Sequence, residues 1–589
     1  WVDGFIAIAF VVPAGVSFWF NGVHRQVWRH TSLRDIIRIV QGALAAAFLF
    51  IPILVLADTY SSYPSVSIFL QVPIWIVILM AVRFGARGRA TGDLGTILRR
   101  EPPMASRAFV VGPTAAVAEA MRLARKSPLG PPIRAIGVVE TGGQNIGRDV
   151  EGVQVMGGLD QLAGLIDHYT ARYGALPWIA IAAPPEDRQT MEAALAVASA
   201  RKLTLLRMAL HGNAALMPVR AADLLARPER RLDPEPVADL VSGARVFITG
   251  GGGTIGGELA RQCAALGPAE LTIYDSSEFN VFEIDQELSR SFPNVHRRVV
   301  IGDVRDEARL EQAMAAAAPD VVIHAAALKH VPLMEMNPNE AILTNVLGAR
   351  RAATIAATLG VKSFTFISTD KAVNPCNVMG ATKRAAELFL QAYAPTAPGT
   401  RFSLVRFGNV LGSKGSVAPL FERQIEDGGP VTVTHPEMTR YFMSVEEASA
   451  LVLQAAALST KTDTTEAILY VLDMGDPVRI MDLAEKMIRM KGLTPGRDIM
   501  IRSTGPRAGE KLTETVFYQR EQVSQTSVDG VLEVMHSTRP PIADVQARLD
   551  AIIAHASRRD PQASLSMMQT LAPELFDEDA WGEQPMQVH

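Results

Sequence analysis

Three uncharged apolar runs open the chain, at residues 4–20, 39–57 and 66–82. Each approaches the ~17–25 residues that an α-helix needs to cross a lipid bilayer. A buried core helix can show the same pattern, but three such runs in close succession favour insertion into a membrane. We therefore expect transmembrane helices within residues 1–85, truncated at the N-terminus because the chain begins at Trp1 and not at Met.

The Arg residues around these runs predict an orientation. Arg25, Arg29 and Arg34 lie between the first two runs and further Arg residues follow the third, whereas residues 58–65 contain no Lys or Arg. Cytoplasmic loops of membrane proteins carry the excess of Lys and Arg. The large C-terminal portion is thus expected in the cytoplasm, with at least one further span upstream of the first residue.

Residues 105–212 alternate short β-rich runs with helical runs, which predicts a small parallel α/β domain. Its first turn keeps one glycine, Gly112, where a dinucleotide-binding fingerprint has three, so the backbone cannot approach a pyrophosphate closely. We expect a degenerate Rossmann-like spacer that has lost its ligand; a weak nucleotide or regulatory site is the alternative. The expected strands are 108–112, 133–139 and 178–182, and the expected helices are 115–126 and 187–201.

A larger α/β unit is expected over residues 243–560. Residues 213–242, rich in Arg, Pro, Asp and Glu, indicate a linker before it. Residues 561–589 form a Met- and acid-rich tail that we expect to fray. In a doubly wound parallel sheet, ligands bind at the carboxyl ends of the strands. The expected strands of this sheet are 246–249, 271–275, 299–304, 321–327, 363–368 and 401–406.

The turn after the first of these strands carries a dinucleotide-binding glycine pattern. Gly250, Gly253 and Gly256 give the spacing G-x-x-G-x-x-G, and a helical run over residues 258–266 follows. Such a turn lets the backbone approach a phosphate, and the free N–H groups and dipole of the helix N-terminus then face the anion.

Acidic and small residues at the next strand ends agree with this site. Asp275 ends the second strand about twenty residues after the glycines, where a carboxylate accepts ribose hydroxyls and repels a 2′-phosphate. This favours NAD over NADP. Asp303 is placed to contact the adenine amine, and the small residues Ala325 and Ala326 let the backbone lie along the cofactor.

Composition narrows the class of protein but does not identify its function. The 589 residues carry a net charge of -4 with a pI near 6.3, so nothing indicates a nucleic-acid partner. Two cysteines, Cys263 and Cys376, are too few for a disulfide framework and suit a reducing compartment. Neither has metal-ligating neighbours in the sequence, so no metal is expected.

The proton chemistry of this nicotinamide-binding unit is unusual. A Tyr-x-x-x-Lys pair is expected, with Tyr as the base that removes a hydroxyl proton. Here Met379 stands four residues before Lys383, and a thioether cannot transfer a proton. Either the enzyme is inactive or the proton chemistry has moved to Thr369, Asp370 and Lys371.

With these residues in view, the chain resembles the extended short-chain dehydrogenase/reductases that act on nucleotide sugars. More closely it resembles the membrane-bound polysaccharide-biosynthesis branch of UDP-N-acetylglucosamine 4,6-dehydratases, over essentially its whole length. Met at the Tyr position is usual in that branch. The resemblance is carried by residues 249–256, 324–332, 368–375, 377–383, 406–413 and 509–512.

The resemblance implies a redox-neutral lyase reaction on a UDP-N-acetylhexosamine. NAD removes hydride from C4, water is lost across C5 and C6, and hydride returns to C6, giving UDP-2-acetamido-2,6-dideoxy-α-D-xylo-hexos-4-ulose. It also implies a multi-pass protein of the bacterial inner membrane, in contact with the lipid bilayer, with a cytoplasmic catalytic domain and a homo-oligomeric state.

Position matching with the family implies the site residues. Asp370 would protonate the departing C6 hydroxyl and Lys371 would be the base at C5. Thr369 would bridge the 4-hydroxyl toward Asp370, Met379 takes the Tyr position, and Lys383 would hold the nicotinamide ribose. The remaining cofactor candidates are Gly250, Gly253, Thr254, Ile255, Gly256, Asp275, Asp303, Val304, Ala325, Ala326, Lys329 and Asn345, and the substrate candidates are Lys329, Asn409, Ser413, Ser416, Val417, Arg440, Arg507, Glu510 and Lys511.

Three other functions stay open. A nucleotide-sugar C4-epimerase shares the first hydride step but relies on the Tyr that is absent here. A dehydratase that inverts C5 can carry Met, but that branch usually lacks membrane helices. A membrane scaffold that only senses NAD or nucleotide sugar is a different class, and the retention of residues 369–371 together with Lys383 argues against it.

Overall fold

The structure is a computed structural model, and its parts form two compact units, residues 1–228 with 488–495 and residues 229–487 with 496–589. Each is described here by itself. The described residues are 2–21, 33–56, 73–74, 76–81, 106–126, 133–184, 187–210, 216–225, 233–507, 509–519, 521–535 and 540–573.

The first two apolar runs fold as helices α1 (Val2–Phe20) and α2 (Leu33–Leu56). The expectation that they span a membrane is wrong: within the described ranges, no helix has the length and apolarity that a bilayer crossing requires. Arg38 places a charge in the second turn of α2, and charges inside a bilayer are costly. The predicted multi-pass localisation in the inner membrane is wrong on the same ground. The third apolar run lies mostly outside the described residues.

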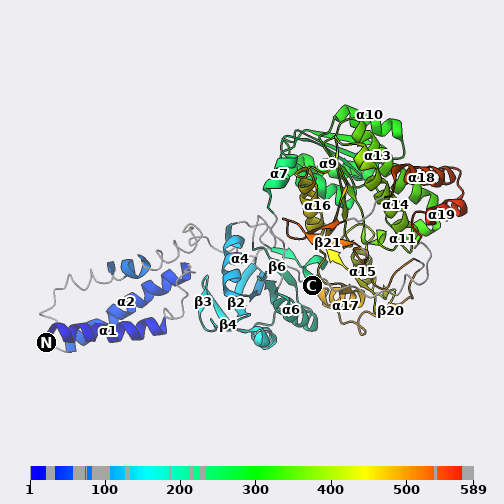
Figure 1. Cartoon of the computed structure of the whole chain (residues 1–589). Coiled ribbons are helices and arrows are strands. Elements are labelled where there is room, and N and C mark those ends of the chain that lie inside the picture. Colours follow the sequence, from blue (N-terminus) through cyan, green and yellow to red (C-terminus); the bar gives the residue numbers. More distant parts are fainter. Residues whose placement is uncertain are drawn as a thin grey trace. The chain divides into compact units, whose positions relative to one another are not determined.

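The first α/β unit contains a seven-stranded sheet of order β3-β4-β2-β1-β5-β6-β7 (Figure 1). Five central strands are parallel, and the edge strands β3 and β7 are antiparallel. The α/β prediction is confirmed here. The strands are β1 (Ser106–Gly112), β2 (Ile133–Glu140), β3 (Asp149–Val150), β4 (Val153–Gly158), β5 (Trp178–Ile181), β6 (Leu205–Met208) and β7 (Leu216–Pro218), with helices α4 (Thr114–Lys126), α5 (Leu162–Tyr173) and α6 (Arg188–Arg201).

The larger unit is built on a nine-stranded sheet of order β10-β9-β8-β11-β12-β13-β18-β22-β21. The seven strands from β10 to β18 are parallel, whereas β22 and β21 are antiparallel. The predicted doubly wound sheet is therefore confirmed. Its strands are β8 (Arg245–Thr249), β9 (Glu270–Asp275), β10 (Arg297–Ile301), β11 (Val321–His324), β12 (Ser363–Ile367), β13 (Arg401–Arg406), β18 (Ile468–Leu472), β21 (Gln522–Gln525) and β22 (Val531–Met535).

Helices cover both faces of this sheet (Figure 1). Along β8, Val246 and Ile248 enter one core and Phe247 enters the other, so both faces of the strand are buried. This explains the continuous apolar runs of the sequence. The helices are α7 (Glu235–Val241), α8 (Thr254–Ala265), α9 (Glu278–Ser291), α10 (Glu307–Ala317), α11 (Val331–Met336), α12 (Pro338–Ala341), α13 (Gly348–Thr358), α14 (Val378–Tyr393), α16 (Val445–Thr460), α18 (Ile542–Ser557) and α19 (Pro561–Gln569).

Short elements after β13 form a smaller substructure of this unit. Three two-stranded pairs, β14–β17, β15–β20 and β16–β19, accompany two helices. Their bounds are β14 (Asn409–Val410), α15 (Val417–Glu426), β15 (Val431–Val433), β16 (Thr439–Arg440), β17 (Phe442–Met443), β19 (Val478–Arg479), α17 (Ile480–Met490) and β20 (Ile501–Ser503).

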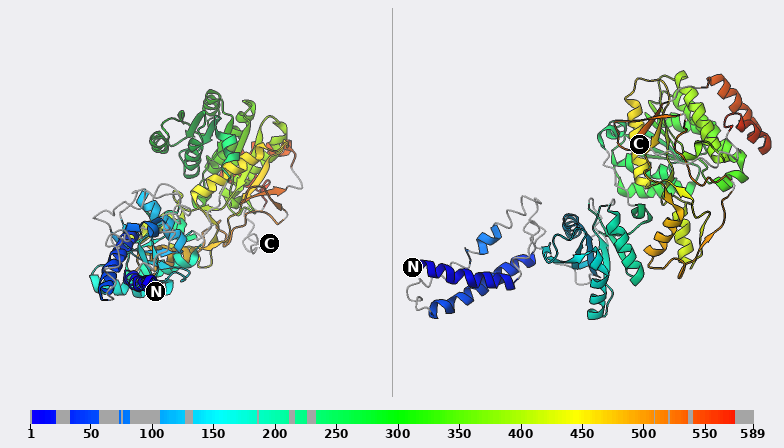
Figure 2. Two further views of the ribbon diagram at one scale, coloured as in Figure 1. Left: turned by 90° about the vertical axis from the view of Figure 1, so that its left-hand side faces the viewer. Right: turned by 60° about the horizontal axis from the view of Figure 1, so that its bottom comes forward.

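Two weakly patterned stretches are more ordered than expected. The stretch interpreted as a linker contributes β7 to the first sheet and α7 to a core of the second, through Val237 and Val241. The expected frayed tail is wrong for residues 561–573, because α19 forms and buries Met568 against the main core. The C-terminal helices lie beside the green helices of the larger unit (Figure 2).

Candidate functional site

The glycine turn after β8 brings backbone segments into close contact. A Cβ on Gly256 would lie 2.1 Å from the Gly250 carbonyl oxygen, and one on Gly250 would lie 2.6 Å from the Ala326 nitrogen. Gly253 is the N-cap of α8, and no side chain caps this end of the helix. The first N–H groups of α8, beginning at Thr254 and Ile255, therefore stay available to an anion such as a pyrophosphate.

Of the two predicted acids, Asp275 ends β9 and Asp303 follows two residues after β10, and both also bind groups of the protein itself. Asp275 is nearly buried, and its two carboxylate oxygens accept the N–H groups of Gly252 at 3.0 Å and Ser277 at 2.9 Å. Its remaining lone pairs are still available to ribose hydroxyls. Burial raises the pKa of Asp303, but hydrogen bonds from Arg305 outweigh it and lower the pKa overall. An adenine contact at Asp303 would have to share its carboxylate with this guanidinium.

The end of β11 is organised by buried polar groups. The His324 ring stacks against Phe364 and Phe366 of the neighbouring strand, and its Nδ1 is 2.9 Å from the Thr249 hydroxyl. Burial lowers the pKa of His324 to about 3, so the ring is neutral. The Asn345 side chain holds the backbone that follows β11. Its amide nitrogen donates a hydrogen bond to the Leu328 carbonyl, and its Oδ1 accepts one from the Leu328 N–H.

Four other predicted residues of the cofactor region have simpler surroundings. Ala325 and Ala326 are half-buried beside the glycine turn, and Val304 is buried against Gly348. Lys329 is exposed. The structure thus gathers the glycine turn, Asp275 and the β11 end at one sheet edge, and these residues fit a dinucleotide.

The residues after β12 form one hydrogen-bonded chain. The Thr369 hydroxyl donates to Asp370 Oδ1 at 2.8 Å, and Lys371 Nζ donates to the same oxygen at 3.0 Å and to Asn409 Oδ1 at 3.2 Å. Asp370 is fully buried, and its Oδ2 has no hydrogen-bond partner among the described residues. A donor, an acid and a base are thus joined within a single turn, η8 (Asp370–Ala372).

Helix α14 packs closely against this turn. A Cβ on Gly380 would lie 2.1 Å from the Lys371 carbonyl oxygen, so only glycine permits the approach. Met379 is buried in an apolar cluster with Met334, Ala341 and Val378. These apolar contacts agree with the chemistry of a thioether, which cannot transfer a proton.

Lys383 is buried and bound to the sheet. Its Nζ donates to the Ile367 carbonyl at 2.8 Å and lies 4.5 Å from the centre of the Phe366 ring. Burial lowers the pKa of Lys383 to about 7, against the opposing effect of Glu387. Two of the amine's three hydrogen positions remain for a ligand.

A buried ion cluster supports the turn after β12, and sequence reasoning missed it. Both oxygens of Glu387 accept hydrogen bonds from Arg406, and Ser368, next to Thr369, donates to Glu387 at 2.6 Å. Arg406 also donates to Glu521 at 2.9 Å. The Arg406 side chain is fully buried. The only sequence signal for this cluster was that Glu387 and Arg406 are charged residues within otherwise apolar stretches.

The predicted substrate residues separate into two groups. Arg440 and Lys511 are buried, and their donors reach main-chain carbonyls: Arg440 those of Thr439, Lys511 and Leu512, and Lys511 that of Val373. A diphosphate contact would therefore compete with internal hydrogen bonds at both. Arg507 is exposed, and its N–H donates to Glu510.

The loop after β14 lies against the cofactor edge. Lys414 donates its N–H to Thr254 in the first turn of α8, and a Cβ on Gly415 would meet the His330 ring. Ser413 is buried, and the buried Ser416 hydroxyl, just before Val417 begins α15, has no hydrogen-bond partner in the described part of the chain. This loop and Asn409 lie near both predicted sites.

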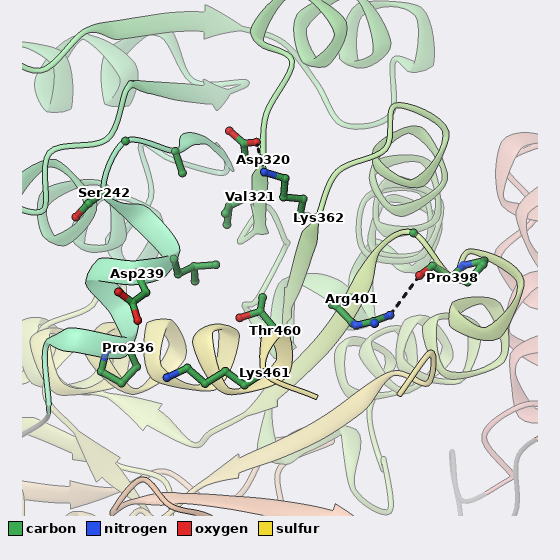
Figure 3. Close-up of a pocket in the computed structure, with 14 residues that line it drawn as sticks. Pro236, Asp239, Ser242, Asp320, Val321, Lys362, Pro398, Arg401, Thr460 and Lys461 are labelled. Carbon is green, nitrogen blue, oxygen red and sulfur yellow. Dashed lines mark hydrogen bonds and ion pairs between the residues drawn. The ribbon is translucent and has the colours of Figure 1, made fainter. Parts of the chain in front are cut away.

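A separate hollow of about 600 Å³ opens at the opposite, amino edge of the sheet (Figure 3). Lys362 and Asp320 form an ion pair there at 3.1 Å, and Arg401 donates to the Pro398 carbonyl. None of the predicted site residues lines it. Among the described residues, no cluster of His, Cys, Asp and Glu could hold a metal ion, and burial raises the pKa of both cysteines.

Comparisons with known proteins point to one family. A family model described as polysaccharide biosynthesis protein matches residues 246–536. Probable polysaccharide biosynthesis protein EpsC of Bacillus subtilis is 35% identical, over 91% of this chain and 90% of that protein.

Two further relatives carry names of different reactions. A UDP-N-acetylglucosamine 4,6-dehydratase (inverting) of Campylobacter jejuni is 41% identical, over 36% of this chain and 64% of that protein. A UDP-glucose 4-epimerase of Rickettsia prowazekii is 33% identical, over 49% of this chain and 82% of that protein.

Proposed function

The chain belongs to the polysaccharide biosynthesis protein family, and we propose that it is an NAD-dependent 4,6-dehydratase of UDP-N-acetylglucosamine. Relatives of the dehydratase and epimerase types place it with the enzymes that act on nucleotide sugars. The observation that carries the finer proposal is the hydrogen-bonded chain Thr369–Asp370–Lys371, in which an acid and a base replace the missing Tyr.

The glycine turn, the uncapped N-terminus of α8 and Asp275 would hold NAD, and Lys383 would hold its nicotinamide ribose. NAD, when bound, supplies a hydride acceptor at C4 of the sugar and a hydride donor at C6. The protein then has to move the protons. It must remove one from the 4-hydroxyl and one from C5, and deliver one to the departing C6 hydroxyl.

The proton order follows from the contacts of the turn. The 4-hydroxyl gives its proton to the Thr369 oxygen while Thr369 passes its own proton to Asp370 over the 2.8 Å contact. Asp370 thereby becomes the neutral acid that the next step needs. The free amine of Lys371 takes the C5 proton as Asp370 protonates the leaving hydroxyl, and Lys371 later returns a proton to C5.

The contacts of Asp370 favour dehydration over epimerisation. An epimerase needs only one proton carrier at the 4-hydroxyl. Here a second group, Lys371, is also held in place: its Nζ lies 3.0 Å from Asp370 Oδ1 and 3.2 Å from Asn409 Oδ1. An acid and a base side by side serve an elimination in which one proton leaves C5 and another reaches C6.

Incubation of the full chain with NAD and UDP-N-acetylglucosamine in heavy water tests the proposal. Dehydration gives a 4-keto-6-deoxy sugar with deuterium at C5, and the NMR couplings of the product report whether C5 is inverted. Formation of UDP-N-acetylgalactosamine without loss of water would instead identify an epimerase. Unchanged substrate would contradict both activities.

A further inference from the structure

Glu514 is a buried carboxylate that the reaction above does not use. Its Oε1 lies 3.9 Å from Lys371 Nζ and 4.0 Å from Arg440 Nη2. The side chain is 3% exposed. Its other oxygen, Oε2, is buried without a hydrogen-bond partner among the residues that the structure describes. A buried carboxylate oxygen without a donor is costly while it carries charge.

The sequence singled out two neighbours of Glu514, but neither faces Lys371. Glu510 accepts the N–H of Arg507, and Lys511 donates to the Val373 carbonyl. Glu514 is therefore the acid of this segment that approaches the amine of the catalytic turn.

The charge state of Lys371 requires such a group. The reaction, as proposed, needs Lys371 as a free amine before it can take the C5 proton. In the structure its Nζ donates to Asp370 at 3.0 Å, and a carboxylate at that distance stabilises the ammonium form. Asp370 cannot take this proton as well, because it receives the proton of the 4-hydroxyl. A second acceptor is needed on the other side of the amine.

We propose that Glu514 accepts the ammonium proton of Lys371 and so prepares Lys371 as the base. The N–H bond of the ammonium breaks, an O–H bond forms on Glu514, and two buried charges become a neutral amine and a neutral carboxyl. Neutralising both charges removes their desolvation cost. A shift of the Lys371 side chain has to shorten the 3.9 Å separation to a hydrogen bond, as often happens when substrate binds.

Other charged and titratable groups face this pair. Asp370 lies on the opposite side of Lys371, and the Arg440 guanidinium holds Glu514 in place while favouring its carboxylate. Cys376 lies within electrostatic range of Glu514, and Tyr441 within range of Asp370. The pH profile of the pair therefore reports the whole group, and the test needs a variant that changes only the acceptor.

Glu514→Gln keeps the volume of the side chain but cannot accept a proton. At pH 7 we expect kcat to fall by about 10²-fold with KM changed less than about twofold. Activity should return toward the wild-type value as the pH rises, because Lys371 then loses its proton directly to solvent. Glu514→Asp keeps the acid and should keep the wild-type pH profile at a reduced kcat. Glu287→Gln, a partly exposed carboxylate of α9, is the matched control.

Exchange of the C5 proton provides a second readout. The 4-keto product of the wild-type enzyme, returned to enzyme in heavy water, should exchange its C5 proton more slowly with Glu514→Gln at pH 7 and at the wild-type rate at high pH. A Glu514→Gln protein with the wild-type pH profile overturns the proposal. The proposal is also overturned if high pH does not restore the lost activity of Glu514→Gln and Glu514→Asp is equally inactive, because that result indicates a structural role.

This inference rests on the proposed function, and the wild-type assay separates the two. A wild-type protein that forms no 4-keto sugar at any pH contradicts the dehydratase function and removes the basis of the inference. An active wild type with an unaltered Glu514→Gln profile contradicts the role of Glu514 alone.

Discussion

The buried cluster around Glu387 offers the sharpest stability test. Glu387→Gln replaces a carboxylate that accepts hydrogen bonds from Arg406 at 2.7 and 2.6 Å, from Arg384 at 3.1 Å and from Ser368 at 2.6 Å. Glu387 and Arg406 are both fully buried. The substitution leaves the charge of Arg406 balanced only by Glu521, and the new amide N–H groups face its donors.

The size of the stability loss expected for Glu387→Gln follows from the ionisation of Glu387. Burial alone would raise its pKa, but the charges and hydrogen bonds of Arg406 outweigh burial and lower the pKa from 4.5 to about 2. This lowering of the pKa corresponds to about 3 kcal/mol. This agrees with the roughly 3–5 kcal/mol lost when one partner of a buried ion pair is removed. We expect Glu387→Gln to lower the free energy of unfolding by about 3 kcal/mol at pH 7.

The sign of the pH dependence is fixed by the lowered pKa. An acid whose pKa is lowered by folding contributes its full stabilisation when the pH is above its pKa in the unfolded protein. That stabilisation is lost as the pH falls through its pKa in the folded protein. Wild type and Glu387→Gln should therefore converge as the pH falls from about 4.5 toward 2. Glu287→Gln, which removes a partly exposed carboxylate paired with Arg261, should cost less than about 1 kcal/mol.

Urea unfolding of the three proteins, followed by circular dichroism over this pH range, measures both effects. Equal losses for Glu387→Gln and Glu287→Gln at pH 7 would refute the reasoning. A difference between Glu387→Gln and wild type that does not shrink with falling pH would show that the loss is one of packing and not of charge.

Two further predictions concern the catalytic turn. Asp370→Asn or Lys371→Ala should abolish dehydration, with at least ~10²-fold lower kcat, whereas Met379→Ala should lower kcat much less. A coupled assay for the 4-keto sugar measures all three variants. Comparable losses of kcat at all three positions would contradict the relocated proton chemistry. Gly380→Ala places a methyl group 2.1 Å from the Lys371 carbonyl, so we expect about 1–3 kcal/mol of destabilisation and a kcat reduced beyond that of the control Gly399→Ala, whose added Cβ meets no atom within 4 Å. Unfolding and kinetic measurements on both glycine variants check this, and equal behaviour of the two would rule out the close approach.

Local pattern was sufficient to predict the sheet and the cofactor edge. Strands such as β8 are continuous apolar runs because both of their faces are buried, and the glycine turn is a local motif between strand and helix. The turn after β12 was also found from sequence, since Asp370 and Lys371 are adjacent. These features depend on neighbours within a few residues.

The rest depends on contacts that are distant in sequence. Arg406 pairs with Glu521 across 115 positions, and Glu514 approaches Lys371 from a segment that is predicted to bind substrate. No periodicity marks such pairs. Arg440 was expected among the substrate-binding residues, but its burial against main-chain carbonyls is set by the tertiary fold. The prediction of transmembrane helices from the apolar runs failed for a different reason: hydrophobicity alone does not distinguish a helix that spans a membrane from one packed against other helices.

The proposed proton chemistry without the usual Tyr requires that the turn after β12 be held firmly in place. A Tyr on α14 would be held by the helix itself, whereas residues on a turn after a strand need support from elsewhere. Here Gly380 allows α14 to contact the Lys371 carbonyl, and Lys511 and Tyr518 donate to the carbonyls at Val373 and Ala372 at 2.9 and 3.1 Å. Catalytic groups must be held to within a fraction of an ångström, so contacts of this kind have to accompany the move. Lys511 and Tyr518 therefore support the turn after β12 directly, and any contact of Lys511 with a nucleotide sugar comes in addition.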